Sequence, residues 1–206
     1  MGFRSAGEPP DVARETNPTL LFVGRLSANK RPDEAIQAFG LLRETMPTAV
    51  LWVVGTGPME DELRMSAPEG VHFLGKISPT EKIERLARAH VLIATSVREG
   101  WGLVVTEAAA VGTPVIAYDV AGLRDSVRAS NGVLSMPNPR ALSSALLEFF
   151  STRDRVGLPE ISPGGVTTWS EVAKRILAIA TEQYPALGPV HDSPGVEVVT
   201  QPGDSA

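Results

Sequence analysis

The sequence predicts an α/β fold with a single, doubly wound parallel sheet of the Rossmann type. Two features carry this prediction. Short, continuous apolar runs recur along the chain, and segments with helical spacing of apolar residues lie between them. Strands that are apolar on both faces are typical of a parallel sheet that helices cover on each side.

Each element has a local signal. Pro32 suits the first position of a helix, Ser78 with Glu81 forms a capping box, and Asn138 can cap a further helix. The expected strands are Thr19–Val23, Ala49–Val54, Val71–Leu74, Val91–Thr95, Pro114–Ala117 and Gly132–Leu134. The expected helices begin at Pro32, near Met59, at Ser78, at Leu103, after Gly122, at Asn138 and at Thr168.

Composition narrows the class of protein. The chain has 206 residues, of which 43% are hydrophobic and 21% charged, as is ordinary for a globular protein with a sizeable core. A formal net charge of −5 argues against nucleic acid as a partner. The chain has no cysteine, no apolar run of transmembrane length and no apolar signal-peptide core at its start. We therefore expect a cytoplasmic protein without a transmembrane segment.

The two ends of the chain differ from its middle. Residues 1–18 are rich in Pro, Gly, Glu and Arg, and we expect them to form a flexible arm. From Pro185 onward, prolines and glycines interrupt every possible element, which predicts a disordered tail over residues 185–206. The folded domain is expected to span residues 19–184.

The stretch SVREGWGLVVTEAAAVG, residues 96–112, organises the chain. It begins as a loop in which Gly100 and Gly102 let the backbone approach a ligand closely, because they carry no Cβ. Its second half is apolar almost all round, which predicts a helix buried in the core. Glu99 and Glu107 frame this stretch. A buried carboxylate is costly unless it meets a cation or hydroxyl donors, so Glu107 is either a satisfied structural acid or a ligand for hydroxyl groups.

Charged and glycine-rich residues follow the first two strands, at the edge where a doubly wound sheet binds its ligands. Arg25 and Lys30 are either a solvated surface patch or cations for a pyrophosphate. The turn Gly55-Thr56-Gly57-Pro58 begins as a dinucleotide-binding motif, but Glu60 stands where GxGxxG requires its third glycine. This mismatch disfavours an NAD-binding domain and indicates a structural turn in the floor of the site.

Glu99 and Glu107 enclose seven residues that begin with Gly100-Trp101-Gly102, and this pattern resembles the EX7E signature of retaining glycosyltransferases of family 4. Those enzymes have the GT-B fold and use nucleotide-sugar donors. The resemblance extends to the "GRL…K" feature at residues 24–30 and to the GxGP turn, and it covers about residues 19–184. The chain is similar to the C-terminal, donor-binding domain of that family.

The resemblance implies a role for each matching residue. Glu99 would reach hydroxyls of the donor sugar, and Glu107 would hold the ribose hydroxyls. Arg25 and Lys30 would hold the donor diphosphate, and the nucleobase would lie against Ile77. The implied catalytic residues are Glu99, Arg25 and Lys30. The implied donor-binding residues are Gly24, Ile77, Gly100, Trp101, Gly102, Leu103 and Glu107.

Other residues near these loops leave alternatives open. Lys82 is either an ordinary exposed helix lysine, which we favour, or a helper at the base-binding loop. Arg124 and Asp125 can touch the sugar, but a helix start accommodates an aspartate in any case, so a structural role is favoured. Ala121 stands where the family usually has the first glycine of a pair, and Gly122 keeps the turn.

The resemblance also implies what the protein binds. The donor substrate is a nucleoside-diphosphate sugar, and no separate cofactor is expected. No metal is expected either, because there is no Asp-x-Asp motif and the three histidines lack metal-ligand spacing. The chain matches no N-terminal acceptor domain, so we expect such a domain as a partner and negligible sugar transfer without it. The alternative is a non-catalytic nucleotide-sugar-binding or partner module, a truncated remnant.

Overall fold

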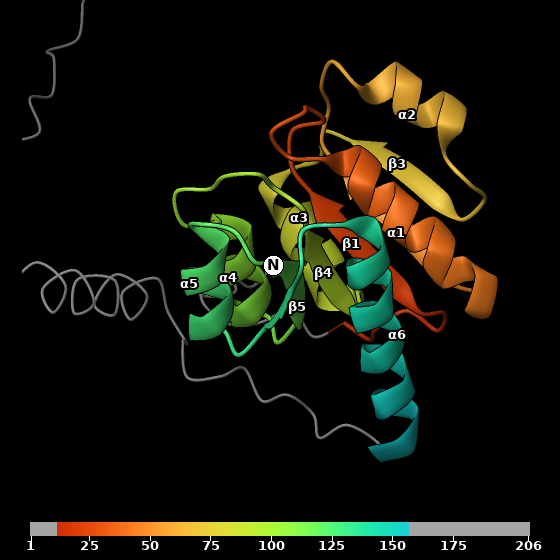
Figure 1. Cartoon of the computed structure of the whole chain (residues 1–206), viewed down its shortest axis with the longest axis vertical. Coiled ribbons are helices and arrows are strands. Elements are labelled where there is room, and N and C mark those ends of the chain that lie inside the picture. The colour runs from red at the N-terminus through yellow and green to blue at the C-terminus, as the bar shows by residue number, and fades with distance from the viewer. Residues whose placement is uncertain (1–11, 157–206) are drawn as a thin grey trace, which may run out of the picture. The chain divides into compact units, whose positions relative to one another are not determined.

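The computed structural model describes residues 12–156, which belong to one compact unit of the chain. Strands and helices alternate along these residues (Figure 1). The strands are β1 (Thr19–Val23), β2 (Val50–Val54), β3 (Val71–Gly75), β4 (Val91–Ala94), β5 (Val115–Tyr118) and β6 (Val133–Ser135). The helices are α1 (Pro32–Thr45), α2 (Glu60–Ser66), α3 (Pro79–Arg88), α4 (Leu103–Ala110), α5 (Leu123–Ala129) and α6 (Pro139–Val156).

The strands of the described part are all parallel and form one sheet in the order β3-β2-β1-β4-β5-β6. The chain winds from β1 to β3 at one edge, returns to place β4 beside β1, and then winds to the other edge. The direction of winding therefore reverses between β1 and β4, which is the topological switch point of a doubly wound sheet. The predicted fold class is confirmed.

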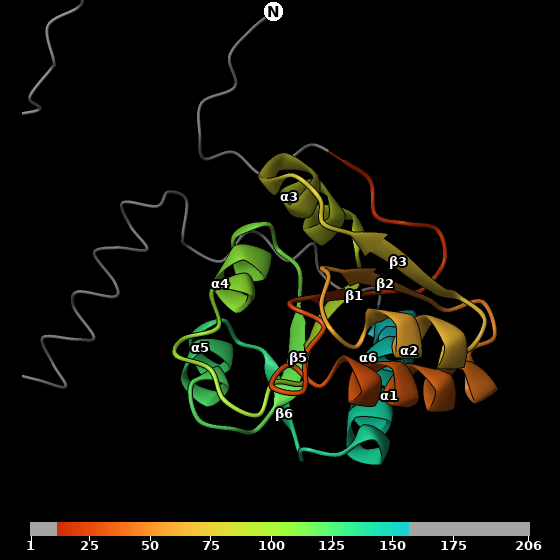
Figure 2. The same cartoon turned by 90° about the horizontal axis from the view of Figure 1, so that it is seen from above.

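Helices cover both faces of the sheet (Figure 2), with α1, α2 and α6 on one face and α3, α4 and α5 on the other. Successive residues of a strand pack into the cores on opposite faces of the sheet. Leu20 and Phe22 of β1 belong to the core under α1 and α6, whereas Leu21 belongs to the core that contains Leu86 of α3 and Val105 of α4. Because both faces are covered, the inner strands β1, β2, β4 and β5 are apolar along most of their length, as the sequence pattern predicts.

Local signals set the element boundaries as predicted. Each strand begins and ends within one residue of its expected bounds. The Ser78 hydroxyl accepts a hydrogen bond from the Glu81 amide at 3.2 Å, and the Glu81 carboxylate accepts one from the Ser78 amide at 3.0 Å. These bonds lower the pKa of Glu81. At the start of α6, Asn138 Oδ1 accepts a hydrogen bond from the Ala141 amide at 2.9 Å. The helix expected at Thr168 lies outside the described residues.

The prediction that α4 is buried in the core holds for only part of the helix. Within this helix only Val105 and Ala108 are buried, and the Leu103 side chain is 63% exposed. Apart from Leu103, the other residues of the helix are partly buried, and Val104 packs against the core that contains Val105 and Ala108. Leu103, the exposed first residue of the helix, lies at the ligand-binding edge of the sheet.

Arg14 and Glu15 lie inside the segment expected to be a flexible arm, yet both contact the domain. The Arg14 guanidinium donates to the carbonyl of Gly112 at 2.6 Å and to that of Ala89. Glu15 forms an ion pair with Arg88 at 2.6 Å, and its amide donates to the Arg88 carbonyl at 3.0 Å. The expectation of loose chain therefore fails here, because Arg14 satisfies carbonyl groups that follow the ends of α3 and α4.

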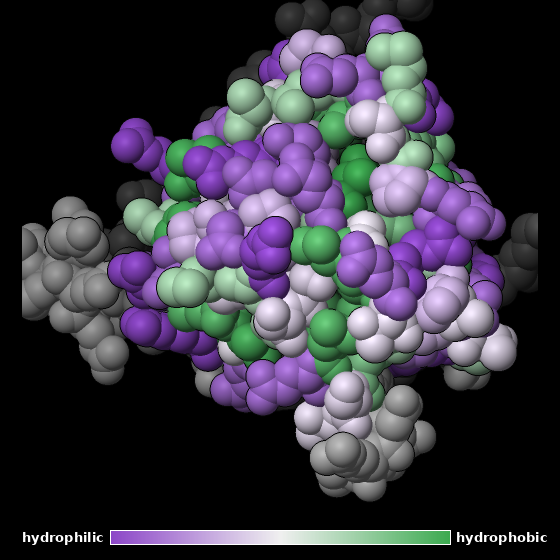
Figure 3. Space-filling model, turned by 45° about the vertical axis from the view of Figure 1, so that its right-hand side comes forward, coloured by the Kyte–Doolittle hydropathy of each residue, from purple (hydrophilic) through white to green (hydrophobic). Residues whose placement is uncertain are grey.

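The face of the molecule in Figure 3 shows apolar side chains as small patches among polar ones. Within residues 12–156, no helix combines the length and the apolar character needed to cross a bilayer. The large apolar side chains that are exposed in this part are Met65, Val97, Leu103, Val133 and Met136. Two of these, Val97 and Leu103, flank Glu99 in the sequence.

Candidate functional site

The candidate site lies at the carboxyl ends of β1 and β4, where the sheet order reverses. The loop after β1 carries Arg25 and Lys30, and the loop after β4 carries Glu99. Ligands of doubly wound sheets bind in the crevice at this position because neighbouring loops turn away from each other there. The fold therefore brings together the charged residues that the sequence analysis selected from two distant segments.

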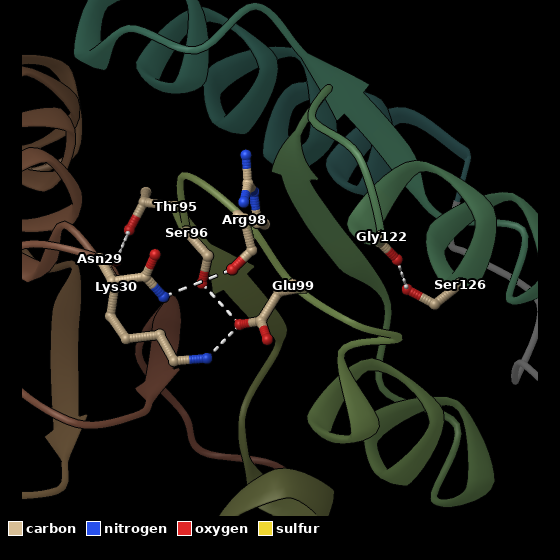
Figure 4. A network of polar contacts seen from close by, with 8 residues as sticks. All are labelled: Asn29, Lys30, Thr95, Ser96, Arg98, Glu99, Gly122 and Ser126. Atoms are coloured by element: carbon tan, nitrogen blue, oxygen red, sulfur yellow. Dashed lines mark hydrogen bonds and ion pairs between the residues drawn. The ribbon is translucent and has the colours of Figure 1, made fainter.

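Buried hydrogen bonds join these two loops across the switch point (Figure 4). The Thr95 side chain is fully buried, and its hydroxyl lies 2.8 Å from the carbonyl oxygens of both Lys30 and Arg31, to which it donates. The Val97 amide donates to the Asn29 carbonyl at 2.8 Å. The position of Lys30 relative to the β4–α4 loop is thus fixed through the backbone.

Lys30 and Glu99 meet through their side chains. The Lys30 ammonium forms an ion pair with Glu99 Oε1, and the Ser96 hydroxyl donates to the same oxygen at 2.7 Å (Figure 4). The Glu99 side chain is only 18% exposed. A hydrogen-bonded pair that is largely shielded from water is held in a defined geometry, unlike an exposed surface pair.

Gly122 explains how the Glu99 loop can approach α5. A Cβ at Gly122 would lie 1.9 Å from the carbonyl oxygen of Glu99, and the φ angle of Gly122 is +83°. The Glu99 amide also donates to the Ala121 carbonyl at 3.4 Å. Only glycine has both the space and the backbone conformation for this contact. Ala121 stands where a first glycine was expected, but the close contact needs a glycine only at position 122.

A second lysine–glutamate pair holds Glu107. The Lys82 ammonium of α3 lies 2.6 Å from Glu107 Oε1 of α4, with the side chains 27% and 15% exposed. The favoured interpretation of Lys82 as an ordinary exposed helix lysine is therefore wrong. The sequence analysis did indicate that a shielded Glu107 needs a cation, and Lys82 is that cation.

A pocket of about 600 Å³ lies beside these pairs, at the ends of β1, β2 and β3. Its walls carry three cations, Arg25, Lys76 and Lys82. Among the described residues, the Arg25 side chain has no hydrogen-bond or ion-pair partner. A pocket of this size with unneutralised positive charge suits an anionic ligand such as a diphosphate. The residues that line it are Val23, Gly24, Arg25, Val54, Gly55, Thr56, Gly57, Lys76, Ile77, Ser78, Pro79 and Lys82.

Gly55, Thr56 and Gly57 of the turn before α2 line this pocket. A Cβ at Gly55 would lie 1.9 Å from the Gly24 carbonyl oxygen, and one at Gly57 would lie 2.3 Å from the Leu26 carbonyl oxygen. The Leu26 amide donates to the Thr56 carbonyl at 3.0 Å. The glycines therefore serve the packing of the loop that carries Arg25, in agreement with the structural interpretation of this turn.

The predicted site residues fall into two neighbouring groups. Gly24, Arg25 and Ile77 line the pocket, whereas Lys30 and Glu99 pair at the switch point, and Glu107 reaches the pocket only through Lys82. The backbone from Gly100 to Leu103 connects Glu99 to α4. A Cβ at Gly100 would meet no heavy atom within 4 Å, so this part of the loop is open. The Trp101 indole donates to the Thr106 hydroxyl at 3.1 Å.

The sequence analysis did not predict one buried contact, which joins β5 to α1. The fully buried Tyr118, at the end of β5, donates a hydrogen bond to Glu34 at 2.7 Å. Burial and this bond raise the pKa of Tyr118 well above its usual value. Glu34 also pairs at 3.1 Å with Arg31, which holds a left-handed φ of 46° directly after Lys30. No local signal joins Tyr118 to Glu34, because the two are far apart in the sequence.

Asp119 and Arg124 form an ion pair beside the site. The hydrogen bond from the guanidinium to Asp119 raises the pKa of Arg124. Arg124 thus contacts a residue of the loop that precedes its own helix. Within residues 12–156, no group of three or more acidic or histidine side chains is arranged to hold a metal ion.

Comparisons with known proteins identify the family of the chain. A family model described as "Glycosyl transferases group 1" matches residues 8–156. The chain belongs to the group 1 glycosyltransferases. It is 30% identical to a D-inositol 3-phosphate glycosyltransferase of Thermobispora bispora, over 91% of this chain and 46% of that protein. It is 37% identical to a glycogen synthase of Mycobacterium tuberculosis, over 52% of this chain and 27% of that protein.

This group 1 glycosyltransferase chain thus spans less than half the length of those two relatives. Solved structures show the same fold. The pneumococcal O-GlcNAc transferase GtfA in complex with UDP and GlcNAc has a TM-score of 0.67 and 18% identity, over 86% of this chain and 38% of that chain. Anabaena Alr3699/HepE in complex with UDP-glucose has a TM-score of 0.65 and 21% identity, over 81% and 49%. At these identities the likeness concerns the fold alone.

Proposed function

We propose that this chain is the donor-binding, C-terminal domain of a retaining glycosyltransferase of family 4, which transfers a sugar from a nucleoside-diphosphate sugar to an acceptor. An N-terminal acceptor domain would complete the enzyme. Family membership, the fold and the charged pocket support this proposal. The names of relatives and neighbours refer to UDP, UDP-glucose and GDP-mannose, which supports a nucleotide-sugar donor without selecting a base or a sugar.

The observation that carries the proposal is the pairing of Lys30 with Glu99 at the switch point, beside a pocket whose walls include Arg25. Donor binding would place the diphosphate between these cations and the donor sugar near Glu99. Ser96 already donates to the Glu99 carboxylate, so the acid is oriented before a ligand arrives. Preorganised groups of this kind stabilise developing charge without reorganisation.

The proposed transfer breaks the bond between the anomeric carbon and the diphosphate oxygen, and the electron pair stays on the leaving diphosphate. The acceptor oxygen forms the new bond to the anomeric carbon, and the proton of the acceptor hydroxyl passes to the leaving diphosphate oxygen. Arg25 and Lys30 would stabilise the charge that builds up on the leaving group, which makes a metal ion unnecessary in this proposal. Glu99 would orient the sugar by accepting hydrogen bonds from its hydroxyls.

Calorimetric titration of the chain with UDP, GDP and ADP, each in EDTA, tests the proposal. We expect one of these nucleotides to bind, and Arg25→Met to weaken that binding by roughly tenfold or more, since a charged hydrogen bond is lost. Arg128→Met is the matched control, because Arg128 is exposed in the last turn of α5, away from the strand ends. Absence of binding by all three nucleotides, or binding only after Mg²⁺ is added, would overturn the proposal.

A further inference from the structure

Lys82 belongs both to the pocket and to the ion pair beside it. Its side chain lines the pocket together with Arg25 and Ile77, while its ammonium lies 2.6 Å from Glu107 Oε1. Glu107 itself is not part of the pocket wall. Lys82 is therefore the physical link between the space in which a nucleotide would lie and the carboxylate expected to hold its ribose.

The two helices hold the partners at fixed positions. The capping box of Ser78 and Glu81 fixes the start of α3 one turn before Lys82. Val105 and Ala108, on either side of Glu107, are buried and anchor α4 to the sheet. Glu107 is only 15% exposed, so its carboxylate would lack compensation without the lysine. The ammonium thus determines where this side chain settles.

The contact leaves Glu107 able to accept further hydrogen bonds. Lys82 engages Oε1, and Oε2 has no hydrogen-bond partner among the described residues. An ionised carboxylate offers several acceptor positions, and a lysine ammonium has three donors. One oxygen can thus be fixed by the ammonium while the carboxylate accepts hydrogen bonds from two neighbouring hydroxyls. A ribose presents such a pair at its 2′ and 3′ positions.

We propose that Lys82 is a positioning residue that sets the Glu107 carboxylate for the ribose hydroxyls of the donor nucleotide, and so determines the preference for ribonucleotides over 2′-deoxyribonucleotides. This inference rests on the proposed function, because it assumes that the pocket binds a nucleoside diphosphate. It assigns Lys82 a role that acts through Glu107 and is distinct from attraction of phosphate by positive charge.

The test compares Lys82→Met with the unchanged chain in titrations with UDP, GDP and ADP and with their 2′-deoxy analogues. The unchanged chain should prefer the ribonucleotide that it binds. Lys82→Met should weaken that ribonucleotide by roughly tenfold and the 2′-deoxy analogue much less, so that the preference shrinks. Lys82→Arg, which keeps a cation for Glu107, should retain most of the preference.

Lys76→Met is the matched control, because Lys76 lines the same pocket and has no ion-pair partner among the described residues. It should weaken both nucleotides equally and leave the preference unchanged. In a Glu107→Gln background, Lys82→Met should cause no further loss of preference, since the two residues act as one unit. Thermal melting of each variant checks that the domain remains folded.

The outcomes separate this inference from the proposed function. Failure of the unchanged chain to bind any of the nucleotides would overturn both. Binding without a preference for ribose, or an equal loss of ribonucleotide and 2′-deoxy affinity in Lys82→Met, would overturn the role of Lys82 alone. An equal loss of affinity for both nucleotides would mean that Lys82 acts on the phosphates through its charge alone.

Discussion

Lys30 and Glu99 form an ion pair across the switch point of the sheet, although they lie 69 positions apart in the sequence. Lys82 and Glu107 form a second pair with a separation of 25 residues. Each of the two acids in the EX7E pattern thus has its own lysine. The two pairs occupy different places, since Lys82 lines the pocket and Lys30 does not.

This separation predicts different effects of removing the two acids. Glu107→Ala should weaken binding of a nucleoside diphosphate by about 1.5–3 kcal/mol, because the ribose loses a charged hydrogen-bond acceptor. Glu99→Ala should weaken the intact nucleotide-sugar and leave the nucleoside diphosphate nearly unchanged, since Glu99 is expected to contact the sugar. Calorimetry with UDP and UDP-glucose, or with the matching pair for another base, measures both.

Glu148→Ala, an exposed position on α6, provides the control for loss of a surface carboxylate. Equal weakening of diphosphate and nucleotide-sugar by both Glu99→Ala and Glu107→Ala would show that the division of roles is wrong.

Much of the fold could be predicted because its signals are local. The capping box at Ser78 and the apolar run at Thr19–Val23 each depend on a few neighbouring residues, and both occur where predicted. Strand order was not encoded in any such pattern. The general rule that ligands bind at the strand ends still placed Arg25, Lys30 and Glu99 at one edge, and the sheet confirms that placement.

The rest of the site depends on side chains that meet only after folding. Lys82 looks like any helix lysine in the sequence, and only the packing of α3 beside α4 gives it Glu107 as a partner. The burial of α4 was overestimated for a related reason. Composition shows that Leu103 is apolar, but it does not show that this side chain is 63% exposed at the start of the helix.

Gly122→Ala should destabilise the domain and disturb the Glu99 loop. The added Cβ would lie 1.9 Å from the Glu99 carbonyl oxygen, and the φ of +83° is unfavourable for alanine. We expect a loss of about 2–4 kcal/mol in the free energy of unfolding, measured by denaturant titration. Gly100→Ala is the matched control in the same region, because its Cβ would meet nothing within 4 Å. Similar stability losses in both variants would contradict the close packing described for Gly122.

Tyr118 should make stability fall at high pH. Burial and the hydrogen bond to Glu34 raise the pKa of Tyr118, so the folded chain holds this proton more tightly than the unfolded chain. The contribution is complete below about pH 10, the usual tyrosine pKa, and is lost as the pH rises above it. The slope from this residue approaches about 1.4 kcal/mol per pH unit.

Tyr118→Phe removes the titrating group while keeping the ring in the core. Denaturant unfolding of both chains between about pH 8 and 11 measures the effect. At the lower pH the variant should be less stable than the unchanged chain by about 1 kcal/mol, because phenylalanine cannot make the hydrogen bond to Glu34. This difference should shrink above about pH 10. Parallel stability curves over the whole range would show that Tyr118 does not titrate differently on folding.

The isolated 206-residue chain should bind a donor nucleotide but transfer sugar at a negligible rate. Transfer requires donor and acceptor in near-attack geometry and a reacting centre from which water is excluded. Val97 and Leu103, on either side of Glu99, are 44% and 63% exposed, so the described residues leave this loop open on one side. A radiolabelled nucleotide-sugar that the chain binds, incubated with candidate acceptors, measures transfer. An N-terminal acceptor domain of a group 1 relative, added in trans, should raise turnover, and Glu99→Ala should abolish that gain. Efficient transfer by the purified chain alone would refute the requirement for a second domain.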